Sequence, residues 1–259
     1  MKRVFAFAII SMAFTSCLKT EETFEIKQDN SGTYTFSMNM DGMLSQLKSM
    51  GSAAGQAMPD NIPTADSTIY LKTYTDTASS LSDEEKKLLS RATAHIHVND
   101  EKDEFSIKLN MPFDNMQQMV YLKQNAFKLM DKLKPSDDAM QGMNLPGMGA
   151  DNPMGGDGNM NPLSNAFSFS AENNVISNKI TDTASVSKLA DDSNLQMLKM
   201  MLTMMGDATN TVTFILPSPV KKYSGPQSKL SDDKKTITFI TSLSDELDKP
   251  SSAEYSVEY

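Results

Sequence analysis

Two segments, Ala92-Thr-Ala-His-Ile-His-Val98 and Phe105-Ser-Ile-Lys-Leu-Asn-Met111, alternate apolar and polar side chains, and Asn99-Asp-Glu-Lys102 lies between them. Alternation with a period of two is typical of a strand that buries one face, and the polar residues in between favour a turn. The two segments therefore predict an antiparallel hairpin whose apolar side chains face the core.

Before this hairpin, Ser82-Asp-Glu-Glu85 predicts a capping box at the start of a short helix. Directly after the hairpin, a helix capped by Asp114 is predicted, because apolar residues recur at helical spacing between Asp114 and Leu133. A second hairpin is predicted around the Asn173-Asn174 turn, followed by a helix over about 186–205. Hairpins followed by helices predict an α+β fold, in which an antiparallel sheet has helices packed on one face and is built from hairpin-helix units.

The predicted folded part is a single α+β domain over residues 33–259. Residues 134–165 interrupt it with a stretch rich in Met, Gly, Asn and Pro that has no periodic apolar pattern. Such a stretch cannot bury enough apolar surface to offset the entropy of ordering, so we expect a disordered insertion there.

The amino-terminal stretch has the three parts of an export signal. Lys2 and Arg3 precede an apolar run from Val4 to Phe14, and Thr15-Ser16-Cys17 follows. The stretch resembles the lipobox signal peptide of Gram-negative bacterial lipoproteins, although Phe14 stands where that family usually has an aliphatic residue. Cys17 is the chain's sole cysteine.

The resemblance implies a signal peptide over residues 1–16, cleavage before Cys17, and a lipidated Cys17 that carries a diacylglycerol and an acylated amino group. Residues 17–32 are then expected to be the lipidated cysteine and a polar tether. The apolar run is too short to span ~30 Å of hydrocarbon, so the membrane is expected as a partner through the lipid anchor alone. The expected location is the cell envelope, at the outer membrane, with the leaflet left open.

The charge balance excludes one class of partner. Without Lys2 and Arg3 the chain has 22 basic and 33 acidic residues, which is a net charge of −11. An acidic body is repelled by nucleic acid, so we expect no nucleic-acid partner. An envelope protein partner stays possible.

No catalytic motif appears in the sequence: it has no Gly-rich phosphate loop, no nucleophile elbow and no His-Glu-x-x-His. We therefore expect a non-enzymatic binding or structural module with no catalytic residue and no cofactor. Its ligand is unknown.

Methionine is unusually frequent, with 21 in the chain, and suggests two alternatives. In one, a Met-rich helix lines a groove of an apolar-ligand (lipid) carrier, because methionine adapts to varied apolar shapes. A central core helix is the favoured interpretation of the same residues. The candidate lining residues are Met197, Met200, Met201, Met204 and Met205.

The second alternative is a copper-handling protein, because thioethers are soft ligands that select Cu(I). Five methionines of the 134–165 insertion would supply them: Met140, Met143, Met148, Met154 and Met160. A composition-biased loop is the favoured interpretation, and no metal site is predicted.

His95 and His97 are the only histidines, and a strand places residues two apart on the same face. Because Ala94, Ile96 and Val98 take the core face, both imidazoles are predicted on the opposite, wet face. A metal site there needs further ligands, so two exposed strand histidines are the favoured interpretation.

Overall fold

The structure of this protein is a computed structural model that describes residues 18–42, 45, 64–133, 166–183, 186, 199, 202 and 206–259. Several expectations lie outside these residues. At the amino terminus they are the signal peptide over residues 1–16 and the lipidation of Cys17. Further along they are the disorder of the 134–165 insertion, its copper-binding methionines, and most of the helix over about 186–205. The candidate groove residues lie in that helix and are also outside: Met197, Met200, Met201, Met204 and Met205.

In the described part of the chain the strands form two sheets, and the larger has eight strands. Across the sheet they follow the order β10 (Gln227–Leu230), β11 (Thr236–Ser242), β8 (Ala208–Ile215), β1 (Leu18–Ile26), β2 (Gly32–Asn39), β5 (Glu104–Phe113), β4 (Thr93–Asn99) and β3 (Ala65–Tyr70). Every neighbouring pair in it is antiparallel except β1 and β8, which run parallel.

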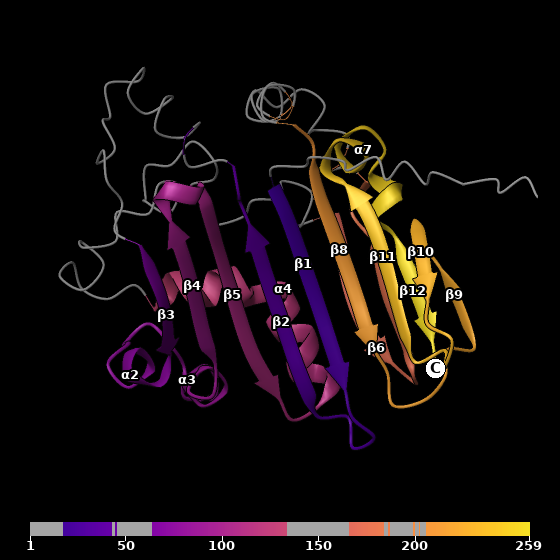
Figure 1. The fold of residues 1–259 in the computed structure, drawn as a ribbon. Coiled ribbons are helices and arrows are strands. Elements are labelled where there is room, and N and C mark those ends of the chain that lie inside the picture. The colour runs from indigo at the N-terminus through magenta and orange to yellow at the C-terminus, as the bar shows by residue number, and fades with distance from the viewer. Residues whose placement is uncertain are drawn as a thin grey trace, which may run out of the picture.

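The smaller sheet has four strands, in the order β6 (Phe167–Glu172), β7 (Val175–Ile180), β12 (Tyr255–Glu258) and β9 (Lys222–Ser224). The described helices are α2 (Lys72–Thr75), α3 (Asp83–Leu89), η1 (Asp100–Lys102), α4 (Met116–Lys132), α7 (Leu243–Asp248) and η3 (Pro250–Ala253). Figure 1 shows α4 and the smaller sheet side by side behind the larger sheet. One face of the larger sheet thus carries the core.

These observations confirm the α+β class and the antiparallel sheet with helices on one face. The hairpin expected over residues 92–111 is β4 and β5, joined through η1. Asn173 and Asn174 form the β6–β7 turn with φ of 52° and 59°, the left-handed values that a two-residue hairpin turn requires. The helix cap differs from expectation, since Asn115 Oδ1 rather than Asp114 accepts the backbone N–H of Gln118 at 3.0 Å.

The predicted tether over residues 17–32 is wrong from Leu18 onward. Residues 18–26 form β1 in the middle of the larger sheet, paired with β2 on one side and β8 on the other. The alternation of Phe24 and Ile26 predicts only a short strand at the end of this segment, because the first half of β1 is mainly polar. Backbone hydrogen bonds to two neighbouring strands order a segment whose apolar pattern is weak.

The core is organised around Phe24, which is fully buried. Its ring stacks on Tyr34 of β2 at 4.7 Å between centroids and on Phe214 of β8 at 4.9 Å. It also stacks on Phe169 of the smaller sheet at 5.4 Å. One side chain of β1 therefore joins both neighbouring strands and the opposite layer.

We expect Phe24→Ala to lower the free energy of unfolding by about 3 to 5 kcal/mol, because it removes three ring contacts and leaves a cavity. Chemical denaturation followed by circular dichroism measures the change. Glu25→Ala, an exposed position on the same strand, is the matched control and should change stability by less than about 0.5 kcal/mol. A loss below about 1 kcal/mol for Phe24→Ala would contradict the central role of this ring.

Candidate functional site

Both histidines lie where the alternation of β4 predicts them. Ala94, Ile96 and Val98 are buried, whereas the side chains of His95 and His97 are 39% and 33% exposed on the opposite face. This outer face of the larger sheet is turned away from α4 and the smaller sheet. The prediction of two wet-face imidazoles is confirmed.

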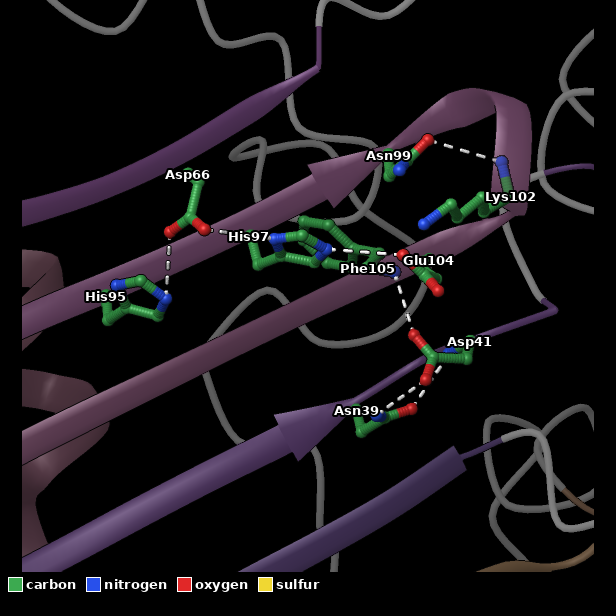
Figure 2. Close-up of polar contacts among 9 residues, drawn as sticks. All are labelled: Asn39, Asp41, Asp66, His95, His97, Asn99, Lys102, Glu104 and Phe105. Atoms are coloured by element: carbon green, nitrogen blue, oxygen red, sulfur yellow. Dashed lines mark hydrogen bonds and ion pairs between the residues drawn. The ribbon is translucent and has the colours of Figure 1, made fainter.

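Only the structure shows what the histidines meet (Figure 2). Asp66 of the edge strand β3 places one carboxylate oxygen 3.2 Å from His95 Nε2 and the other 3.7 Å from His97 Nδ1. On the other side of the His97 ring, Glu104 Oε2 lies 3.4 Å from Nε2 of this histidine. The four side chains form a chain of contacts across three neighbouring strands, which we call the His–carboxylate cluster.

The surroundings limit how these rings turn. Thr68 Oγ1 lies 3.2 Å from His95 Nδ1, so both nitrogens of this ring have a polar neighbour. Both nitrogens of His97 likewise face a carboxylate. Asp66 remains 65% exposed, so solvent reaches the middle of the cluster.

The turn beside the cluster is fixed by side-chain caps. Asn99 Oδ1 accepts the backbone N–H of Lys102 at 3.3 Å, and Asp103 adopts a left-handed φ of 56°. Asp41 accepts the backbone N–H of Phe105 at 3.0 Å and receives an Asn39 amide hydrogen bond at 2.8 Å. These bonds hold the start of β5, and with it Glu104, in register with β4.

Imidazole nitrogens and carboxylate oxygens are ligand types for zinc and copper. Among the residues that the structure describes, however, no group of three or more His, Cys, Asp or Glu side chains is arranged to hold a metal ion. The cluster can donate or accept hydrogen bonds at the surface.

A second polar group lies inside the core and was missed from the sequence. Glu22, 6% exposed, accepts a hydrogen bond from Tyr34 at 2.8 Å and is paired with Lys123 of α4. Burial, with the negative charge of Glu22, raises the pKa of Tyr34 well above its ordinary value. Glu22 lies two residues before Phe24 and four before Ile26, so the period-two pattern could have indicated that it points inward.

Among the described residues, the hydroxyl of Tyr255 is buried and has no hydrogen-bond partner. Burial is the main cause that raises its pKa, and the charges of Glu22 and Glu246 add to it. Tyr34, Tyr255 and Glu22 are enclosed between the layers, and the Glu22–Lys123 pair joins α4 to the larger sheet.

A third group joins α3 to α4. The sequence Ser82-Asp-Glu-Glu85 forms the expected capping box, in which Ser82 and Glu85 each accept the other's backbone N–H. Glu85 also accepts hydrogen bonds from Tyr121 at 2.8 Å and Lys132 at 2.7 Å. The Lys132 contact is the main cause that lowers the pKa of Glu85 to about 2.

A shallow depression of about 110 Å³ lies between the end of the β1–β2 hairpin and the β6–β7 turn. Asn30, Met116, Glu172, Asn174 and Tyr259 are among its lining residues. Drug-sized ligands occupy pockets of roughly 300 to 1,000 Å³, so this depression is too small for such a ligand.

No protein-family model and no curated protein matches the sequence. Among solved structures, the chain is similar to the NMR structure of the folded domain of LppM from Mycobacterium tuberculosis, with 7% sequence identity and a TM-score of 0.36. The match covers 94% of this chain and 90% of the other. At this identity and TM-score, the likeness says nothing about function.

We expect the contacts of Glu85 to make part of the stability acid-sensitive. Its folded pKa of about 2 lies below the ordinary 4.5, so its contribution is full above pH 4.5 and is lost as the pH falls towards 2. Glu85→Gln should lower the free energy of unfolding at pH 7 by about 2 to 4 kcal/mol. The same substitution should also make the free energy of unfolding less dependent on pH between pH 4.5 and pH 2.

Denaturant unfolding at a series of pH values measures both effects. The matched control is Glu84→Gln, since Glu84 is the exposed neighbour in the same helix. An equal effect of the two substitutions would show that the contacts to Tyr121 and Lys132 add nothing to stability.

Proposed function

We propose that this protein is a lipoprotein of the bacterial cell envelope, anchored by acyl chains on Cys17, whose folded part is a non-enzymatic binding or structural module. The observation that carries the proposal is the sole cysteine, which directly follows a charged and apolar segment and a pair of small residues. We place the protein at the outer membrane and leave the leaflet open.

The position of the first strand supports this proposal. β1 begins at Leu18 and is paired along its whole length, so Cys17 directly precedes a strand of the larger sheet. Acyl chains on Cys17 would therefore be attached to an ordered strand. Among the residues that the structure describes, no helix is long and apolar enough to cross a membrane.

The environments of the titratable groups support the proposal that the folded part is a non-enzymatic module. Strongly shifted pKa values are typical of active sites, but structural ion pairs produce them as well. Here the carboxylate with a lowered pKa of about 2, Glu85, caps a helix and binds Lys132. Tyr34 and Tyr255 are enclosed in the core. These groups all serve packing, and the ligand of the module is unknown.

The experiment that tests the anchor is Cys17→Ala in cells that process lipoproteins. We expect the variant to move from the detergent phase to the aqueous phase, because no other thiol can be acylated. Ser16→Ala is the matched control: it keeps a small residue before the cysteine and should partition as the unaltered protein does. Mass spectrometry should find Cys17 as the acylated first residue of the mature chain.

Unchanged membrane partition of Cys17→Ala, or a mature chain that retains Met1 to Ser16, would contradict the proposal.

A further inference from the structure

The expected tether between lipid and fold is missing. Leu18, one peptide bond after Cys17, already pairs with Ala208 of β8, and Lys19 pairs with Asn39 of β2. Consecutive Cα atoms are ~3.8 Å apart, so acyl chains on Cys17 would be attached within about one residue of the sheet. This inference rests on the lipidation proposed above.

The strand ends and connecting elements beside Leu18 form one end of the larger sheet. We call this end, which is made of strand ends and not of an outermost strand, the anchor edge. β2 ends here at Asn39 and β8 begins at Ala208. On one side lies the η1 turn between β4 and β5, and on the other side lies α7 after β11. Figure 1 shows these ends together at the top, opposite the β1–β2 turn and the carboxyl terminus.

The anchor edge is tied together by hydrogen bonds, so the lipid would not hang on a loose end. Ser244 at the start of α7 donates its backbone N–H and its hydroxyl to Asp207 at 3.1 and 2.6 Å. Thr20 donates to Asn210 across the parallel β1–β8 pair at 3.2 Å. A rigid edge joined directly to the anchor restricts how the fold can tilt on a bilayer.

The described charges of this edge indicate which bilayer surface it fits. Carboxylates outnumber ammonium groups there, with Asp41, Asp100, Glu101, Asp103, Asp207, Asp245 and Asp248 against Lys19, Lys102, Lys199 and Lys249. Anionic headgroups would repel such an edge, whereas zwitterionic headgroups would not.

We propose that the anchor edge is a membrane-facing surface that rests on zwitterionic phospholipid headgroups and holds the strands upright. The nine residues of β1 span about 30 Å at ~3.3 Å per residue. The β1–β2 turn at the opposite edge then stands about 30 Å above the bilayer surface.

Single labels test this orientation. Acylation of the sole cysteine leaves no thiol, so one introduced cysteine gives a unique label site. Glu101→Cys and Asp245→Cys lie on the two sides of β1 at the anchor edge, and Gln28→Cys lies in the opposite turn; all three side chains are exposed. Each lipidated, fluorophore-labelled variant is placed in phosphatidylcholine vesicles that carry a nitroxide on a fraction of the headgroups.

We expect the headgroup nitroxide to quench the labels at 101 and 245 several-fold more than the label at 28. A spacer of 20 Gly/Ser residues between Cys17 and Leu18 has an r.m.s. length of about 25 Å, so it should make quenching at the three positions similar. Replacing part of the phosphatidylcholine by phosphatidylglycerol should reduce quenching at 101 and 245, because the edge is acidic.

The outcomes separate the two proposals. Loss of all quenching in the labelled Cys17→Ala proteins is expected from lipid anchoring, and quenching that persists there would overturn the proposed function. Equal quenching at 28, 101 and 245 in the lipidated protein without a spacer would overturn the orientation alone. Stronger quenching on phosphatidylglycerol would overturn the preference for a zwitterionic surface.

Discussion

The ring of Phe24 is the contact on which the arrangement of the two layers depends. Register places Tyr34 directly opposite it on one neighbouring strand and Phe214 directly opposite on the other, and both rings stack on it. Because Phe169 of the smaller sheet stacks on the same ring, one residue fixes the strand order around β1 and the position of the second layer. The parallel β1–β8 pair brings the first strand beside one that lies about 190 residues later, and such long-range pairing forms only with favourable packing to offset the entropy of closing the chain.

Two buried carboxylates of the interior, Glu22 and Glu85, join α4 to neighbouring elements. Glu22 lies on the same strand as Phe24 and binds both Tyr34 and Lys123, so a charge is held next to the aromatic stack by partners from two elements. A buried carboxylate without partners would lower the free energy of unfolding by several kcal/mol. Because Lys123 of α4 is one of the partners of Glu22, the position of α4 depends on that of β1. Glu85 likewise joins α3 to α4, because it accepts hydrogen bonds from Tyr121 and Lys132 of α4. The charged groups of the core thus specify which elements meet.

In the described residues, the outer face of the larger sheet carries mainly polar side chains, with Tyr70, Ile215 and Ile240 exposed among them. Its His–carboxylate cluster lies near the anchor edge. One cross-strand row runs from Lys19 through Asn39, Ser106 and His97 to Asp66. With neighbouring strands ~4.8 Å apart, the cluster is about 20 Å along the sheet from the attachment point of the proposed lipid anchor and at a similar height. In the proposed orientation, the solvent-accessible imidazoles stand close to the headgroups, whereas the β6–β7 turn is remote from them.

The sequence by itself determined the elements that depend on local chemistry. Period-two alternation predicts β4 and β5 and the face of the sheet on which His95 lies. The Ser82–Glu85 spacing predicts the capping box, and Asn173-Asn174 predicts the β6–β7 turn. The tertiary structure alone decided that β1 is a central strand, that Glu22 is paired with Tyr34 and Lys123, and that Asp66 and Glu104 flank the histidines. Local spacing fixes which face of a strand a side chain takes, because the backbone repeats every two residues. It does not fix which distant strand lies alongside, because that choice depends on the summed packing of surfaces far apart in the chain.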